Sequence, residues 1–89
     1  MLAGKRVFVT GAATGIGAAT CRHLVSLGAS VLGAGLDAID GRALAAELRA
    51  APFRFVEADL TREADVRSAV AAAVTAFGGL DGVVNAAGI

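Results

Sequence analysis

The feature that most restricts the fold of this chain is a glycine-rich turn placed directly after a short apolar run. Residues Arg6–Val9 read Arg-Val-Phe-Val, and Thr10–Gly17 follow as Thr-Gly-Ala-Ala-Thr-Gly-Ile-Gly. The first run predicts a buried strand, and the Ala-rich stretch that opens at the last glycine predicts a helix. Because Gly11, Gly15 and Gly17 carry no Cβ, the backbone there can turn sharply and come close to a ligand and to the helix.

A helix that begins at such a turn favours an anion, because its first N–H groups and the positive end of its dipole point at whatever lies over the turn. Among common cellular groups, a pyrophosphate fits this arrangement best. The glycine order differs from Gly-x-Gly-x-x-Gly, and no Lys-Ser/Thr pair follows, which argues against a nucleoside triphosphate loop of the Walker type. An ordinary strand-to-helix turn is the alternative, and the glycine motif alone does not distinguish it from a phosphate-binding turn.

The length allows one domain at most, residues 1–89, near the lower limit for a useful core. A hydrophobic content of 56% and a mean hydropathy of +0.70 exclude a disordered chain. Eight basic and eight acidic side chains cancel without forming a long block of either sign. We therefore expect no nucleic-acid partner and no anionic membrane surface.

No segment of the sequence predicts export, membrane insertion or metal binding. Residues Met1–Lys5 lack the apolar core of a signal peptide, and the longest apolar candidate, Ala69–Phe77, is too short to span a bilayer. The single cysteine, Cys21, cannot form an internal disulfide. Cys21 and His23 lie two positions apart on an expected helix and point away from each other, so they cannot share a metal. A cytoplasmic protein is expected.

The rest of the chain alternates expected strands with expected helices. Strands are expected at 7–9, 31–34, 53–56 and from 81 to 84, and helices at 16–27, from 39 or 40 to 49, and from the N-cap Thr61 to 77. On the first helix, Ile16, Leu24 and Leu27 fall near one apolar stripe. Arg54, between two phenylalanines, predicts that the third strand is a sheet edge.

This alternation, with short links, predicts parallel strands joined by right-handed crossovers. We expect an α/β fold with strand order 3-2-1-4, helices on both faces and a ligand crevice beside the first strand. Asp37, Asp59 and Asn85 follow three of the strands and would share one rim with the glycine turn. Each has a local alternative: a helix cap for Asp37, loop polarity for Asp59 and a turn for Asn85. Their joint placement favours a dinucleotide site.

Three motifs together resemble the start of a short-chain dehydrogenase/reductase: Thr10-Gly11-x-x-x-Gly15-Ile16-Gly17, Asp59-Leu60, and Asn85-Ala86-Ala87-Gly88. The resemblance covers essentially the whole chain. It implies the NAD(P)-binding, Rossmann-like half of an oxidoreductase that transfers hydride between a nicotinamide and an alcohol or carbonyl group. Alanine at position 86, where the family usually has a second asparagine, is a mild departure.

The resemblance also implies which residues bind the cofactor. The glycine motif would hold the pyrophosphate and the adenosine-ribose side, Asp59-Leu60 would contact the adenine, and the last motif would support the sheet and line the cofactor. The expected cofactor-binding residues are Thr10, Gly11, Ala13, Thr14, Gly15, Ile16, Gly17, Asp37, Asp59, Leu60, Asn85, Ala87 and Gly88.

The resemblance favours NAD over NADP. NAD-preferring members place an acidic residue at the end of the second strand; Gly35 aligns best with that position, and Asp37 follows two residues later. NADP-preferring members place a basic residue near there or within the glycine turn, where this chain has Leu36 and Ala13-Thr14. No cation is offered to a 2′-phosphate, and Asp37 would repel it.

No catalytic residue is expected in this chain. The family's chemistry uses a serine, a tyrosine and a lysine four residues after the tyrosine, all beyond the fourth strand. This sequence has no tyrosine, and its only lysine, Lys5, precedes the first strand. We therefore expect the amino-terminal, cofactor-binding part of an enzyme, inactive by itself, with an exposed fourth-strand edge through which it self-associates.

Two other functions stay open from the sequence. The chain could be a stand-alone nucleotide-binding or interaction module that a second chain completes. A methyltransferase-like sheet that binds a nucleoside cofactor is a weaker alternative, because the entry at Thr10-Gly11 and the tail at Asn85–Gly88 argue against it. The substrate cannot be read, since the family builds its substrate pocket mainly from the later half of the chain.

Overall fold

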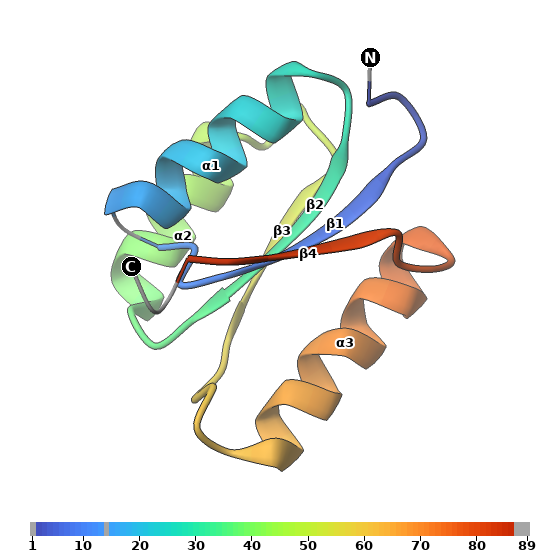
Figure 1. Ribbon diagram of the computed structural model, residues 1–89. Coiled ribbons are helices and arrows are strands. Elements are labelled where there is room, and N and C mark those ends of the chain that lie inside the picture. The colour runs from blue at the N-terminus through green and yellow to red at the C-terminus, as the bar shows by residue number, and fades with distance from the viewer. Residues whose placement is uncertain (1, 14, 87–89) are drawn as a thin grey trace.

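The computed structural model describes residues 2–13 and 15–86, and in them four strands alternate with three helices (Figure 1). The strands are β1 (Arg6–Thr10), β2 (Ser30–Gly35), β3 (Phe53–Glu57) and β4 (Gly82–Asn85). The helices are α1 (Gly15–Ser26), α2 (Ala38–Glu47) and α3 (Glu63–Phe77). The strands form one parallel sheet in the order β3-β2-β1-β4, so the expected fold class is confirmed.

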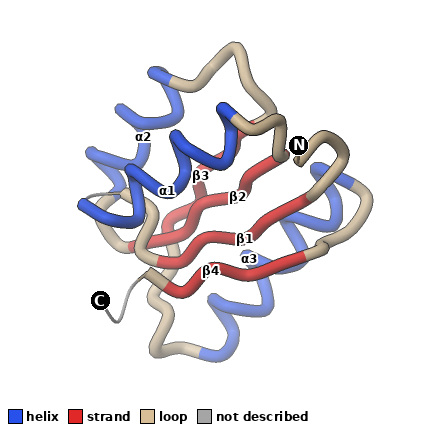
Figure 2. Tube along the Cα trace, turned by 45° about the horizontal axis from the view of Figure 1, so that its top comes forward, coloured by secondary structure: helices blue, strands red, loops and turns tan. Residues whose placement is uncertain are grey.

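The sheet has a hydrophobic core on each face. Successive side chains along a strand point to opposite faces, so Val9 and Val31 pack toward α1 and α2, whereas Phe8 and Leu32 pack toward α3. Figure 2 shows α1 and α2 together on one side of the sheet and α3 on the other. β1 lies inside the sheet, paired with β2 and β4, which places the turn after β1 between its two neighbours.

The core-facing side of α1 matches the expected stripe only in part. Leu24 packs against the core as expected, but the buried residues are Gly17, Ala18 and Cys21, and Ile16 is 55% exposed. The reason is the contact at Gly17: a Cβ built there would lie 1.7 Å from the carbonyl oxygen of Gly11, so this residue must face the turn. The helix is thereby rotated relative to the expected stripe. Cys21 is a free, buried cysteine on this face.

The expected N-cap of α3 is wrong by one residue, because the helix begins at Glu63 with Arg62 in the N-cap position. Thr61 instead turns back toward Asp59, whose carboxylate accepts hydrogen bonds from the backbone N–H and the hydroxyl of Thr61. The edge position expected from Arg54 is confirmed, since β3 is outermost and Arg54 is exposed. Between residues 2 and 86, with residue 14 left aside, no helix is long and apolar enough to cross a membrane.

Candidate functional site

The turn after β1 depends on its glycines in two different ways. Gly11 and Gly15 have φ values of 65° and 57°, in the left-handed region that glycine adopts without strain. Gly17 has no such conformation, but its missing Cβ lets α1 lie directly on the carbonyl of Gly11. A dinucleotide-binding turn needs these same two properties, a tight bend and close packing of the helix.

Two further residues hold the turn against β2, and the expected site did not include them. Ala12 is fully buried, and its backbone N–H donates to the carbonyl of Ala34 at 3.2 Å. Gly33 makes room for it, because a Cβ on Gly33 would lie 2.6 Å from the Cβ of Ala12. A glycine inside an apolar strand is the sequence signal for such a close approach.

A hollow of about 230 Å³ lies beside the turn, where β2 and β3 end. It brings together three expected residues, Gly11, Asp59 and Leu60. It is also lined by Leu36, Ala58 and Thr61, which were not among the expected cofactor-binding residues, and by Gly35. The backbone N–H of Ala58 donates to the carbonyl of Gly35 at 2.9 Å, so the chain after β3 stays against the end of β2. The structure therefore brings Gly11, Asp59 and Leu60 together at one rim, as the strand order predicted.

Asp59 is held in one orientation by its neighbours. Its Oδ1 accepts from the Thr61 hydroxyl at 2.6 Å and from the Thr61 N–H at 3.0 Å, and its own N–H donates to Oδ2 of Asp65 at 2.8 Å. The two bonds from Thr61, with the hydroxyl contributing most, lower the pKa of Asp59 below its usual range. A fixed, ionised carboxylate thus stands at the edge of the hollow.

Asp37 caps a helix, which is the local role that the sequence analysis gave as the alternative to cofactor binding. It is the N-cap of α2, and its Oδ1 accepts from the backbone N–H of Asp40 at 3.0 Å. It is exposed and is not among the residues lining the 230 Å³ hollow, although Leu36 beside it is. A hydrogen bond to Asp37 and repulsion from its charge raise the pKa of Asp40. The cofactor role of Asp37 stays a prediction.

Thr10 and Asn85 tie together the ends of β1 and β4, which lie side by side near the start of α1 in Figure 1. The Thr10 hydroxyl donates to Oδ1 of Asn85 at 2.7 Å, and the N–H of Ala86 donates to the carbonyl of Thr10 at 3.2 Å. The last motif is thus connected to the first by direct contact. Asn85 remains exposed at this rim.

The remaining expected residues fall into two groups. Ala13 is half-buried in the turn, while Gly15 and Ile16 are exposed on the first turn of α1. Thr14, Ala87 and Gly88 lie outside the described residues. Across the described part of the chain, no group of three or more histidine, cysteine, aspartate or glutamate side chains is placed to hold a metal ion.

Comparison with known proteins places this geometry in a family. A family model described as short chain dehydrogenase matches residues 5–89. The chain is 52% identical over 86 residues to L-fucose dehydrogenase of Oryctolagus cuniculus, covering 97% of this chain and 30% of that protein. It is 47% identical over 88 residues to 3-alpha-(or 20-beta)-hydroxysteroid dehydrogenase of Mycobacterium bovis, covering 99% of this chain and 34% of that protein.

Solved structures agree with the sequence comparisons. The 3-ketoacyl-(acyl-carrier-protein) reductase from Brucella melitensis, complexed with NADH, superposes with a TM-score of 0.89 and 34% identity over 93% of this chain and 34% of that one. A variant actinorhodin polyketide ketoreductase with NADPH gives a TM-score of 0.83 and 28% identity over 91% of this chain and 32% of that one.

The chain spans about a third of the length of these relatives and corresponds to their amino-terminal, cofactor-binding region. The match includes the glycine turn, the rim at Asp59 and the end of β4, since the family model runs from residue 5 to residue 89. The family model, the superposed structures and the glycine turn all indicate the same family. The chain belongs to the short-chain dehydrogenase family.

Proposed function

We propose that this chain binds a nicotinamide dinucleotide and forms the NAD(P)-binding part of an oxidoreductase that transfers hydride between the nicotinamide and an alcohol or carbonyl substrate. The observation that carries the proposal is the contact of Gly17 with the carbonyl of Gly11. It seats the start of α1 on the turn after β1, so the first N–H groups of the helix face the rim that Asp59 and Asn85 share. When bound, the nicotinamide would supply or accept the hydride.

The described residues fit the diphosphate and the adenine ring of a dinucleotide in their chemistry. A Cβ on Gly15 would meet nothing within 4 Å, so the first turn of α1 is open where a diphosphate would lie. The 230 Å³ hollow offers the apolar side chains of Leu36 and Leu60 to a flat ring, with the Asp59 carboxylate at its edge. Ligand sites of this kind are mostly apolar, with a few polar groups that fix orientation.

Two matched glycine substitutions test the binding site. Gly15 and Gly78 both have positive φ values, 57° and 81°, and a Cβ on either would meet nothing within 4 Å. Gly15→Ala and Gly78→Ala therefore impose the same kind of backbone strain, about 1–2 kcal/mol each. Only Gly15 lies on the proposed diphosphate site, because Gly78 is the C-cap of α3.

In a calorimetric titration with NADH, we expect Gly15→Ala to weaken binding at least tenfold and Gly78→Ala to leave it within about twofold, a change below 0.5 kcal/mol. Circular dichroism of both variants checks that the fold is kept. A folded parent chain that binds neither NADH nor NADPH would overturn the proposal.

We further propose that the site prefers NAD to NADP. Asp37 places an exposed carboxylate directly after Leu36, and no basic side chain lines the hollow among the described residues. One relative was solved with NADH and another with NADPH, so the family permits either. A 2′-phosphate near Asp37 would meet a like charge and no compensating cation.

Asp37→Ser tests this preference without removing the helix cap, since serine caps helices about as well as aspartate. We expect the variant to bind NADPH severalfold more tightly than the parent chain does, with NADH affinity nearly unchanged. Tighter binding of NADPH than of NADH by the parent chain would contradict the preference.

We propose that the 89-residue chain binds its cofactor without turning over substrate. A tyrosine acid, which the family's chemistry requires, is absent from the sequence. General acid–base catalysis contributes about 10²–10⁴-fold to such rates. Oxidation of NADH by the chain in the presence of ketone and aldehyde substrates is expected to stay at the buffer rate, and a measurable substrate-dependent rate would refute this.

We also propose that the chain self-associates through β4. Within the described sheet this strand pairs with β1 alone, and Val83 on it is 60% exposed. In sedimentation velocity, the parent chain is expected to show species larger than the monomer, and Val83→Lys is expected to shift the distribution toward monomer. A parent chain that sediments as a monomer at all concentrations would contradict this proposal.

A further inference from the structure

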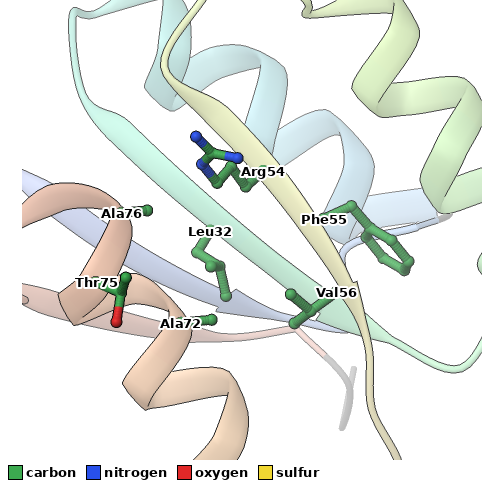
Figure 3. Close-up of a pocket in the computed structure, with 7 residues that line it drawn as sticks. All are labelled: Leu32, Arg54, Phe55, Val56, Ala72, Thr75 and Ala76. Atoms are coloured by element: carbon green, nitrogen blue, oxygen red, sulfur yellow. The ribbon is translucent and has the colours of Figure 1, made fainter.

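A second hollow, larger than the one on the cofactor rim, lies between β3 and α3 (Figure 3). It has a volume of about 680 Å³, within the range of small-molecule sites. None of the expected cofactor-binding residues lines it, and it shares no residue with the 230 Å³ hollow. Any ligand here would therefore be additional to the dinucleotide.

The floor of this hollow is apolar because of strand register and helix composition. Leu32 pairs with Arg54 across β2 and β3, and Val56 lies two residues further along the same face. α3 contributes Ala72 and Ala76, whose side chains are too small to fill the space above β3. Figure 3 shows Leu32 and Val56 between β3 and α3, with Phe55 on the opposite side of β3.

Arg54 is the cation that lines this hollow. Its side chain lies on the same side of β3 as Leu32 and reaches above it toward α3 (Figure 3). Arg6 and Arg22 are paired with carboxylates, whereas no hydrogen bond or ion pair joins the Arg54 guanidinium to another described residue. Of the described residues that line this hollow, Thr75 is the one other with a polar side chain.

A neighbouring hollow of about 420 Å³ extends the groove toward the amino end of β3. The two hollows share Arg54 and Ala76, and the second adds Arg49 together with the apolar ring of Phe77. Among the described residues, no acidic side chain lines either hollow. The two hollows together form a groove with an apolar floor at Leu32, Val56, Ala72 and Ala76 and with two cations, Arg54 and Arg49, and its described lining holds no countercharge.

We propose that this groove binds an amphipathic carboxylate, with its apolar chain along Leu32, Val56, Ala72 and Ala76 and its carboxylate on the guanidinium of Arg54. Arginine suits this role because its planar fork can donate two parallel hydrogen bonds to one carboxylate and is weakly hydrated. The apolar floor loses water when the chain of the ligand covers it. A compact inorganic anion would leave that floor uncovered, so the shape favours a ligand with a tail.

The test measures binding of decanoate to the whole 89-residue chain by equilibrium dialysis, below the concentration at which decanoate forms micelles. Decanol is the neutral probe of the same chain length. We expect decanoate to bind at least tenfold more tightly than decanol, and Arg54→Gln to remove most of that difference. Arg42→Gln is the matched control, because Arg42 is an exposed cation on α2, across the sheet from the groove.

A second pair of variants tests the floor independently of charge. Ala76→Phe fills the part shared by both hollows and is expected to weaken decanoate binding at least tenfold, whereas Ala71→Phe, on an exposed position of α3, is not. NADH affinity is expected to be unchanged in the Arg54→Gln variant, so a failure here is distinct from a failure of the dinucleotide site. Decanoate binding that is absent, equalled by decanol, or insensitive to Arg54→Gln would overturn the proposal.

Discussion

Arg6 and Asp81 join the start of β1 to the residue before β4 through four hydrogen bonds, three of which go to the Asp81 carboxylate. Nε of Arg6 donates to Oδ2 at 2.9 Å, Nη2 donates to Oδ1 at 3.1 Å, and the backbone N–H of Arg6 donates to Oδ2 at 2.8 Å. The guanidinium lies against Gly79, where a Cβ would be 2.5 Å from Nη1. The N–H of Asp81 donates to the carbonyl of Arg6 at 2.7 Å, so this pair fixes where the edge strand β4 begins.

This pair predicts a specific loss of stability in acid. The hydrogen bond from the Arg6 side chain, then the one from its backbone, lowers the pKa of Asp81 from 3.8 to about 2. A carboxyl whose pKa is lower in the folded chain stabilises the fold above its unfolded pKa, and that stabilisation is lost as the pH falls through the folded value. We expect the urea midpoint of the parent chain to fall between pH 4 and pH 2.

Asp81→Asn removes this titrating group, so its urea midpoint should depend less on pH over the same interval. Some acid sensitivity remains, because Arg22 lowers the pKa of Glu47 in the same direction. Glu57→Gln is the control, since it removes an exposed carboxylate that forms no ion pair with another described residue. Equal pH dependence in the parent chain and Asp81→Asn would contradict the prediction.

The sheet could be predicted from sequence because its determinants are local. Runs of apolar residues separated by helix-spaced segments indicated four parallel strands, and Arg54 identified the edge at β3. The glycine turn could be predicted as well, since Gly11 and Gly15 adopt backbone conformations that favour glycine in any context. These signals do not require knowledge of what a residue touches.

The residues that were missed depend on contacts between segments far apart in the sequence. The rotation of α1 follows from the approach of Gly17 to Gly11, and the burial of Ala12 follows from the space at Gly33. The groove beside β3 arises where small side chains of α3 face a strand that the helix does not fully cover, and spacing along α3 alone cannot indicate that. Thr61 was mistaken for a helix cap because its partner, Asp59, precedes it.

Cys21 is expected to be unreactive in the folded chain. It lies on α1 and is fully buried in the core, and this burial raises the pKa of its thiol from 9.0 to about 11. Because each pKa unit is a factor of ten, the thiolate should be about a hundredfold scarcer near neutral pH than for an ordinary thiol. Alkylation with iodoacetamide should be slow in buffer and fast in concentrated urea. Equally rapid alkylation in both would show that this core is open.

The effect of Gly41→Ala on stability is expected to change sign when Phe55 is replaced by alanine. The ring of Phe55 lies over Gly41 of α2, and a Cβ on Gly41 would be 2.2 Å from Cε2 of that ring. Gly41→Ala should therefore cost about 1–3 kcal/mol of unfolding free energy in the parent chain. In the Phe55→Ala background the clash is gone, and alanine should stabilise the helix over glycine by about 0.5–1 kcal/mol. Equal effects in the two backgrounds would mean that the ring does not limit this position.

Gly17→Ala is expected to damage the cofactor site and the fold together. The added methyl would fall 1.7 Å from the carbonyl oxygen of Gly11, so α1 must move away from the turn. We expect a loss of about 1–3 kcal/mol in unfolding free energy and no measurable NADH binding.

Gly82→Ala provides the comparison, because a Cβ on Gly82 of β4 meets nothing within 4 Å and its φ is not positive. It should leave NADH affinity unchanged and raise stability by about 0.5–1 kcal/mol, as alanine does for glycine within a strand. Urea unfolding measures the stability of the two variants, and calorimetry measures their NADH affinity. The comparison separates the general effect of replacing glycine by alanine from the specific clash with the carbonyl of Gly11. A Gly17→Ala variant that binds NADH as the parent chain does would mean that the approach of α1 to Gly11 is not needed for the site.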